Sequence, residues 1–296
     1  MPAREEREKQ SAALTSLLAA VGLTALKIIV GIATGSLGIL AEAAHSGLDL
    51  IAALMTFLAV RFSGRPPDAG HPYGHGKIEN LSALAESALL LATCVWVVRE
   101  AIHRLTTQRV EIEVTWWAFA VMFISIAIDA SRSRILARAA SKYKSQALEA
   151  DALHFETDIW SSSVVILGLA AVKAGEWWPA ASILRHADAI AALGVSALVV
   201  WVTFQLGRRT IDALLDTAPA GMEARIAAIV EAVPGVRNCH QIRIRHSGPT
   251  LFIDLHVLVD GQQTLAQAHA LTVTIENAIQ GVAPGADVTV HPEPFE

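Results

Sequence analysis

The sequence reads HSGLD at residues 45–49 and HFETD at residues 154–158, so one spacing of histidine and aspartate occurs twice inside long apolar segments. Residues i and i+4 share one face of a helix, so each pair directs an imidazole and a carboxylate the same way. Ionisable groups at membrane depth cost about 2.5–3.5 kcal/mol each on insertion scales and are seldom without function. We therefore expect one shared metal site of two nitrogens and two oxygens, rather than a structural polar network. Its ligands would be His45, Asp49, His154 and Asp158.

The composition favours a membrane protein. Of the 296 residues, 53% are hydrophobic and only 17% are charged, which is too apolar for a soluble protein of this length. The net charge of −5 is spread along the chain and offers no basic surface for nucleic acid. The two cysteines lie far apart without a C-x-x-C spacing, which excludes a disulfide framework and an all-thiolate metal site.

Six segments are long enough to cross a bilayer, because a spanning helix needs about 20 mainly apolar residues. They cover residues 12–33, 38–61, 80–103, 114–136, 149–172 and 187–207. The first segment is too long for a signal peptide and is interpreted as a retained helix. Basic residues gather before it, in the connection 61–77 and in the connection 131–145, which we expect to be a loop. The positive-inside rule then places both termini in the cytoplasm.

The composition changes near residue 212, where a soluble segment begins. Capping and alternation predict helix, strand, strand, helix and strand in that order. Their predicted ranges are 221–233, 237–246, 250–260, 264–280 and 287–291. The expected fold is thus an all-α six-helix transmembrane domain, residues 1–211, followed by a small cytoplasmic α+β domain, residues 212–296, of the ferredoxin-like or metallochaperone-like kind.

Two further clusters contain metal-ligating residue types. In the second connection, Asp68, His71 and His75 lie among glycines that let the chain wrap an ion, although surface loops also carry histidine by chance. The tail is rich in histidine, with a carboxylate at residue 254 and another at residue 293, and this density favours metal binding over an ordinary surface. The tail histidines are His240, His246, His256, His269 and His291.

Catalytic motifs are missing from the sequence. It contains no H-E-x-x-H, no G-x-S-x-G and no glycine-rich nucleotide loop, so we do not expect an enzyme. An intramembrane hydrolase would lack a general base separate from the ligands, apart from Glu42 or Asp151, which share the ligand faces of their helices. The alternative that the residues leave open is a membrane-bound metal sensor or scaffold that binds metal without transporting it.

These features together resemble the cation diffusion facilitator family, over nearly the whole chain. The resemblance implies that the two His/Asp pairs form the transport site and that the loop cluster is the second metal site of the bacterial homodimeric exporters. It implies tail metal sites at His240, His256, His269, His291 and Glu293. It also implies that Lys77 takes part in a salt bridge that locks the dimer, with Asp216 as its partner.

The resemblance further implies a homodimeric metal exporter. We expect it to be an antiporter driven by protons, because metal binding to imidazole and carboxylate releases protons, and short outer loops without a targeting segment fit a bacterial inner membrane. The His-Asp/His-Asp set is similar to members that prefer Zn²⁺ over Cd²⁺, while Fe²⁺, Co²⁺ and Ni²⁺ stay open and Mn²⁺ is disfavoured. The partners would be divalent metal ions, protons, the lipid bilayer and a second copy of the chain, with zinc also held in the tail as a structural or regulatory ion.

Overall fold

The computed structural model describes residues 2–35, 37–106, 116–177 and 187–295. The chain divides into two compact units. The first contains Met1–Gly64 and Ile78–Thr210, and the second contains Arg65–Lys77 and Ile211–Glu296. The second unit therefore includes the connection between the second and third helices as well as the tail. The functional division predicted between residues 211 and 212 stays a prediction.

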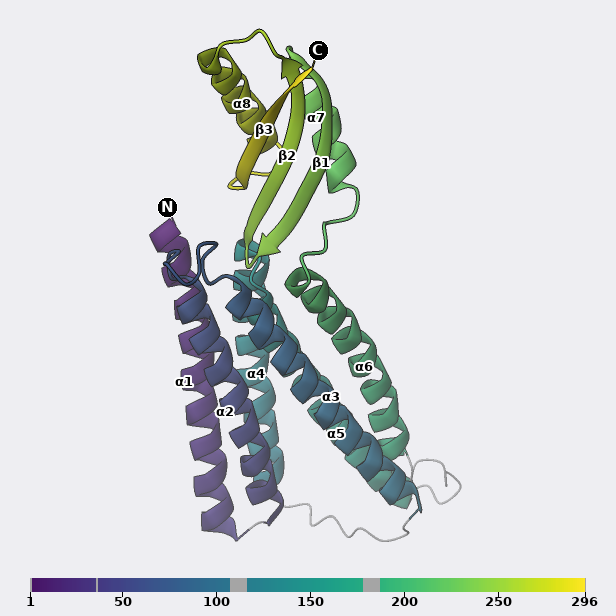
Figure 1. Ribbon diagram of the computed structural model, residues 1–296. Helices are drawn as coiled ribbons and strands as arrows, with labels where there is room; N and C mark the ends of the chain where they lie inside the picture. Colours follow the sequence, from purple (N-terminus) through teal and green to yellow (C-terminus); the bar gives the residue numbers. More distant parts are fainter. Residues whose placement is uncertain (1, 36, 107–115, 178–186, 296) are drawn as a thin grey trace. The chain divides into compact units, whose positions relative to one another are not determined.

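Six long helices provide the first unit (Figure 1). They have 27 to 33 residues each, about 40–50 Å at 1.5 Å per residue, which exceeds a hydrocarbon core of about 30 Å. Three stretches of the described residues are both long and apolar enough to cross a membrane, namely Arg4–Thr34, Glu42–Ser63 and Lys77–Arg99. The helices are α1 (Pro2–Thr34), α2 (Leu37–Ser63), α3 (Lys77–Thr106), α4 (Trp116–Tyr143), α5 (Gln146–Trp177) and α6 (Ala187–Leu214).

The basic stretch 131–145 is helical as far as Tyr143, so its prediction as a loop was wrong. Arginine, lysine and alanine are strong helix formers, and the stretch also buries Leu136 and Ala140 in the helical core. Lys144 has a left-handed φ of 52° and separates α4 from α5. The helices therefore continue beyond the apolar segments by which they were predicted.

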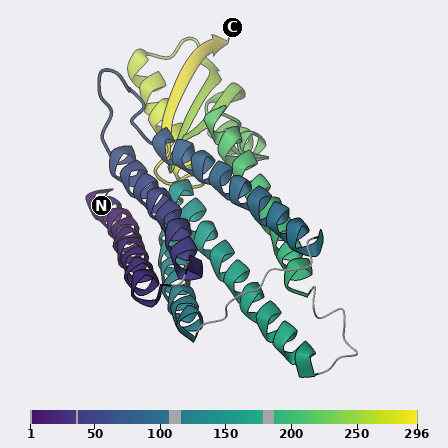
Figure 2. The same ribbon diagram turned by 90° about the horizontal axis from the view of Figure 1, so that it is seen from below.

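Small residues allow the helices of the first unit to approach closely. In both views α1 runs beside α2 (Figures 1 and 2). Helix α4 also contacts α5, α1 contacts α4, and α2 contacts α5. Ala13, Ala59, Ala147 and Ala152 are buried in a core around Phe155. Such small side chains are typical of helix contacts inside a membrane, where close packing drives association.

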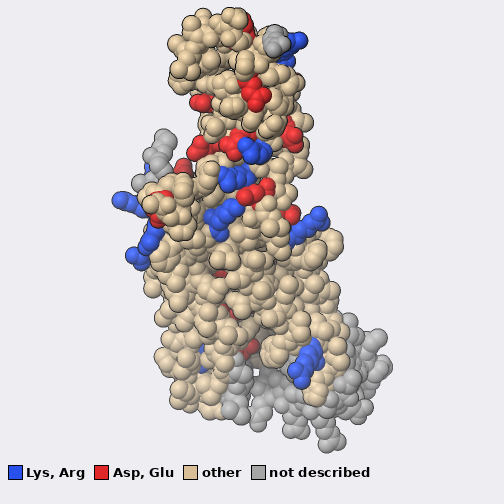
Figure 3. Space-filling view, viewed as in Figure 1, with Lys and Arg blue, Asp and Glu red and all other residues tan. Residues whose placement is uncertain are grey.

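The outward side chains of these helices are apolar. Leu18, Ile32, Trp96, Trp201 and Phe204 are each 60–69% exposed, and the helical surface in Figure 3 is largely without charge. An aqueous surface with this many exposed large apolar side chains would aggregate. The helical unit is therefore built to face lipid.

The second unit folds the tail as helix, strand, strand, helix and strand, which confirms the predicted order of elements in the small α+β domain. The sheet has the order β1-β2-β3, in which β1 and β2 are antiparallel and β2 and β3 are parallel. Its core includes Ile226, Val230, Ile253 and Ile275, each fully buried. The elements are α7 (Met222–Glu231), β1 (Val236–Ser247), β2 (Thr250–Asp260), α8 (Leu265–Gln280) and β3 (Asp287–Phe295).

The last strand is longer than predicted, reaching Phe295 instead of residue 291. The extension contains Pro292 and Pro294, although proline cannot donate to a ladder. They are tolerated because β3 is an edge strand, and residues two apart can both direct the missing N–H toward its open side. The extension matters because it places Glu293 in register with Leu258 of β2.

Candidate metal centres

The two His-x-x-x-Asp pairs meet between α2 and α5. The Nε2 atom of His154 lies 3.2 Å from Oδ1 of Asp49 and 3.7 Å from Oδ2 of Asp158. The Nε2 atom of His45 lies 3.9 Å from Oδ1 of Asp158. Two ligands of a tetrahedral zinc ion with bonds of about 2.0–2.1 Å stand about 3.3–3.4 Å apart. Three of the predicted ligands, His45, Asp49 and Asp158, offer ligand atoms that all lie within 4.8 Å of one another. The fourth, His154, adjoins this group through the carboxylates of Asp49 and Asp158.

Burial of this tetrad is uneven. The side chain of His154 is 7% exposed and that of Asp49 is 12% exposed, whereas His45 retains 32%. The ring of Phe155 lies edge-on to His154 at 5.4 Å between centroids and limits its movement. The ligand set is therefore anchored on the side of His154 and more open on the side of His45.

Several buried charges around the tetrad were missed by the sequence reasoning. Glu86 is fully buried and accepts a hydrogen bond from Thr56. Asp151, which the sequence placed on the ligand face of its helix, is also fully buried and accepts a hydrogen bond from Ser16 at 3.2 Å. A lone charged residue inside an apolar helix was the available signal, because such residues rarely face lipid.

Arg132 is a buried arginine that shares the partner Ser16 with Asp151. Arg132 donates to Oδ1 of Asp129 at 3.1 Å and to Oγ of Ser16 at 3.2 and 3.3 Å. Its guanidinium also stacks over the ring of Phe155, 3.5 Å from the centroid. The guanidinium is thus contacted on its face by Phe155 and at its N–H groups by Asp129 and Ser16, which fixes its position.

The loop cluster forms a second group of ligand atoms. Asp68 lies 3.2 Å from Nδ1 of His71 and 3.4 Å from Nε2 of His75. Backbone N–H groups of His71 and Gly70 also donate to Asp68 at 2.7 and 2.9 Å. These donors, with His71 the larger cause, hold the pKa of Asp68 below its usual value. The loop therefore presents an ionised carboxylate and two imidazoles to one point.

The tail cluster arises from strand register. His240 of β1 pairs with His256 of β2, which in turn pairs with His291 of β3, so three imidazoles lie in a row across the sheet. Glu293 lies 2.7 Å from Nδ1 of His256, 3.2 Å from Nε2 of His240 and 3.8 Å from Nε2 of His291. The hydrogen bond with His256 is the main reason that the pKa of Glu293 is lowered.

This donor set suits a resident zinc ion in the tail. Imidazole nitrogens with a carboxylate oxygen are ordinary zinc ligands, and Nδ1 of His240 is buried without a hydrogen-bond partner among the described residues. His269 lies exposed on α8 and is not part of the group formed by His240, His256 and Glu293. Its predicted role as a ligand stays a prediction.

The predicted salt bridge joins two parts of the second unit. Lys77 Nζ lies 2.8 Å from Oδ1 of Asp216 and 3.4 Å from the carbonyl oxygen of Leu214. The two side chains are 38% and 42% exposed, so the pair contributes little stability by itself. Whether it locks a dimer stays a prediction.

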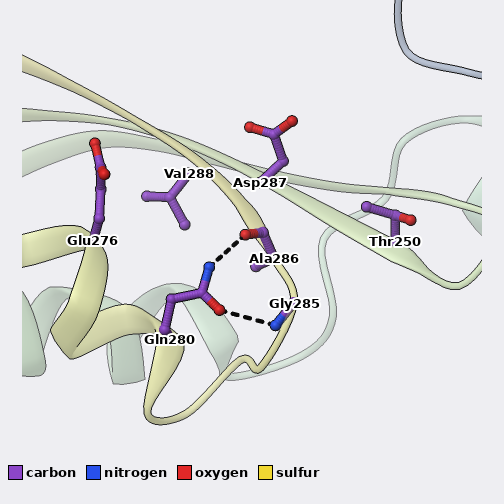
Figure 4. A pocket seen from close by; sticks show the side chains of 7 residues that line it. All are labelled: Thr250, Glu276, Gln280, Gly285, Ala286, Asp287 and Val288. Atoms are coloured by element: carbon purple, nitrogen blue, oxygen red, sulfur yellow. Dashed lines mark hydrogen bonds between the residues drawn. The ribbon is translucent and has the colours of Figure 1, made fainter. Parts of the chain in front are cut away.

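A pocket of about 470 Å³ lies between the end of α8 and the start of β3 (Figure 4). Gln280 crosses it, accepting a hydrogen bond from the Gly285 N–H at 2.9 Å and donating to the Ala286 carbonyl at 2.6 Å. Its lining includes two carboxylates, of Glu276 and Asp287, and no histidine or cysteine. It therefore does not resemble the three metal centres.

The fold and its sites define a membrane protein that binds metal ions, with one centre among its helices and others outside them. Comparison with known families agrees with this class. The family model for the cation efflux transmembrane domain matches residues 13–215, and that for the cytoplasmic domain of cation efflux proteins matches residues 219–295. The chain belongs to the cation diffusion facilitator family.

Curated relatives align over almost the whole chain. The cation-efflux pump FieF of Cronobacter sakazakii is 36% identical over 290 residues, covering 96% of this chain and 92% of that protein. FieF of Pectobacterium atrosepticum is 32% identical with the same coverage. Among solved structures, the nickel form of a MamM CTD variant is 28% identical, covers 26% of this chain and all of that chain, and has a TM-score of 0.25.

Proposed function

We propose that this protein is a homodimeric antiporter that exports divalent transition-metal ions from the cytoplasm in exchange for protons, with zinc as its main substrate. The observation that carries the proposal is the tetrad of two imidazoles and two carboxylates buried between α2 and α5. Relatives that cover almost the whole chain are named cation-efflux pumps, which supports export as the direction.

The charge of the tetrad suits a dication. Asp49 and Asp158 bring two negative charges, while the neighbouring Asp129 is already paired with Arg132. Imidazole and carboxylate are good ligands for zinc and for other first-row divalent ions. The set contains no thiolate, and a site without thiolate suits a transported ion because the ion must leave again.

Proton exchange follows from the ligand chemistry. A metal ion binds neutral imidazole and ionised carboxylate, so binding releases protons, and protonation weakens the site. A histidine titrates near neutral pH when unperturbed, at a pKa of about 6.5. His45 and His154 would thus bind metal from the cytoplasm and take up protons from the outer side. The net charge of the site changes little if two protons replace one dication.

The tail centre is proposed to regulate transport from the cytoplasmic side. Both termini would be cytoplasmic, as the positive-inside rule predicts, and the match of residues 219–295 to a domain described as cytoplasmic supports this. The tail would hold zinc at His240, His256 and Glu293, sense cytoplasmic metal and tighten the dimer. The loop centre would act as a structural or relay site. The membrane would be a bacterial inner membrane.

The decisive test measures flux in proteoliposomes. Purified full-length protein is reconstituted with a trapped zinc-sensitive dye under an imposed pH gradient, and wild type is compared with Asp49→Asn and Asp158→Asn. Asp287→Asn, an exposed tail carboxylate at the start of β3, is the matched control. We expect zinc flux that requires the gradient, disappears in both tetrad variants and persists in the control.

Other outcomes separate the rivals. Normal flux in either tetrad variant would refute the assignment of the transport site. Stoichiometric zinc binding without flux would favour the sensor or scaffold. In that case Fe²⁺, Cd²⁺, Co²⁺ and Ni²⁺ are tested in the same vesicles before the transport proposal is abandoned.

A further inference from the structure

Lys27 is a cation inside the membrane unit that the proposed exchange of metal for protons does not use. It interrupts the apolar run of α1, and its side chain is only 6% exposed. Its Nζ atom donates to Oγ of Ser46 at 2.7 Å and lies 3.2 Å from Oε2 of Glu42. An ammonium at this depth costs several kcal/mol unless it is paired, so it is expected to have a function.

The partners of Lys27 flank a ligand of the tetrad. Ser46 directly follows His45, and Glu42 precedes His45 by three residues, so both lie within one turn of it on α2. Thr24 of α1 donates to the backbone oxygen of Ser46 at 3.0 Å, which fixes α1 against α2 at this level. The Nε2 atom of His45, the residue next to Ser46, lies 3.9 Å from Oδ1 of Asp158, so the contact of Lys27 with Ser46 brings the ammonium close to the tetrad.

Among the described residues, Arg132 and Lys27 are buried cations near the tetrad, and they differ in their freedom to move. Arg132 is held by Asp129, by Ser16 and by the face of the Phe155 ring. Lys27 has a flexible four-carbon stem and a point charge, and the side chain of its anionic partner Glu42 is 55% exposed. Of the two, Lys27 is the cation that can change partners without disrupting the core.

Such a cation is needed between the departure of the metal ion and the uptake of protons by the two histidines, while the tetrad holds neither. Asp49 and Asp158 face each other across the tetrad, and two unbalanced carboxylates in a medium of low polarity repel each other strongly. We propose that Lys27 is a tethered cation that turns from Glu42 toward Asp158 as the metal leaves, competing with the metal for the tetrad and assisting its release. This inference rests on the proposed function of the tetrad as the transport site.

The proposal predicts opposite effects on affinity and turnover. Lys27→Met keeps the length of the apolar stem and removes the charge. We expect the zinc Kd of the tetrad to fall about tenfold and the rate of zinc flux to fall by a similar factor, within the range of ordinary coupling energies. Lys27→Arg restores part of the flux. A purely structural lysine would weaken binding and flux together.

Glu42, the anionic partner of Lys27, provides a second variant that should change the zinc Kd in the opposite direction. Glu42→Gln releases Lys27 toward the tetrad, so the zinc Kd should rise. In the Lys27→Met background the same Glu42→Gln change should have much less effect on the Kd, because no cation remains to be released. The double-mutant cycle thus separates a tethered cation from simple addition of charges, for which the two changes would be independent.

The experiment uses the full-length protein in detergent for zinc titration and in proteoliposomes for flux. Subtracting the titration of Asp49→Ala isolates the tetrad from the loop and tail centres. Lys142→Met is the matched control, since Lys142 pairs only with Glu8 among the described carboxylates, and retention volume on size exclusion checks folding. The proposal is supported by tighter zinc binding with slower flux in Lys27→Met, together with non-additive effects of Lys27→Met and Glu42→Gln on the zinc Kd.

Three results would overturn it: unchanged binding and flux in Lys27→Met, weakened binding in that variant, or additive effects in the cycle. Absence of zinc flux in wild type would instead count against the proposed function. The affinity shifts at the tetrad would then still be measured by titration alone, so the two failures are distinguishable.

Discussion

Glu79 is expected to hold together the ends of several helices in the first unit. It lies in the first turn of α3 with only 1% of its side chain exposed. Its carboxylate accepts hydrogen bonds from Lys9 of α1 at 2.9 Å, from Ser63 of α2 at 2.9 Å, and from Ser145 between α4 and α5. One buried anion therefore links elements that are far apart in the sequence.

The size of its contribution can be worked from these contacts. Hydrogen bonds to a charged group contribute about 1.5–3 kcal/mol each, so three would give about 4.5–9 kcal/mol. Two donors keep another partner after truncation, because Lys9 also pairs with Glu6 at 3.0 Å and Ser63 also donates to the Val60 carbonyl at 3.1 Å. We therefore expect Glu79→Ala to lower the free energy of unfolding by about 3–5 kcal/mol.

Denaturant titration in detergent micelles, followed by tryptophan fluorescence, measures this effect. All seven tryptophans lie between residues 96 and 201, so the signal reports on the helical unit. Glu149→Ala is the matched control, because Glu149 pairs with Arg209 at 2.8 Å but is 38% exposed and should contribute at most about 1 kcal/mol. A loss of less than about 1 kcal/mol in Glu79→Ala would refute the reasoning.

Three further predictions concern the second unit. His256→Ala should abolish the zinc-induced protection of β1, β2 and β3 in hydrogen exchange, which in wild type is worth about 2.7 kcal/mol at a zinc concentration of 100 times Kd. Zinc flux should persist in this variant. Complete loss of flux would contradict a regulatory tail. Burial and the nearby Glu231 raise the pKa of Cys239 to about 11. In a Cys94→Ala background its alkylation at pH 8 should therefore be about two orders of magnitude slower than that of a free cysteine, and should accelerate as the pH approaches 11, whereas a fast reaction at pH 8 would show an accessible thiolate. Thr264 and Gln267 form a capping box at the start of α8, so Thr264→Ala should destabilise this helix by about 1 kcal/mol, seen as faster amide exchange in its first turn; unchanged exchange would mean that tertiary packing alone holds the helix end.

The sequence was sufficient for features that depend on local spacing. A spacing of i to i+4 between His45 and Asp49, and between His154 and Asp158, places each pair on one helical face whatever the tertiary fold. The alternation of apolar residues in the tail predicted its strands in the right order. The composition of Asp68, His71 and His75 predicted a cluster that needs only a tight loop, and the structure forms that cluster.

Other features depended on partners that are distant in the sequence. The stretch 131–145 was predicted as a loop because of its charge, but helix propensity and the burial of Leu136 keep it helical. Lys27 and Glu86 gave only the signal of isolated charges in apolar helices. Their roles depend on hydrogen-bond partners in α2, which are Ser46 for Lys27 of α1 and Thr56 for Glu86 of α3.

Hydrophobic length and helical or strand periodicity are local properties, so the sequence was enough to predict a chain of long apolar helices with paired ligands, followed by a small α+β domain. Which ligands converge depends instead on the tertiary structure. It brought α2 against α5, and strand register aligned His240, His256 and His291 while leaving His269 on a helix outside the cluster. Convergence is set by packing and backbone pairing across large separations in the chain, and no local pattern contains that information.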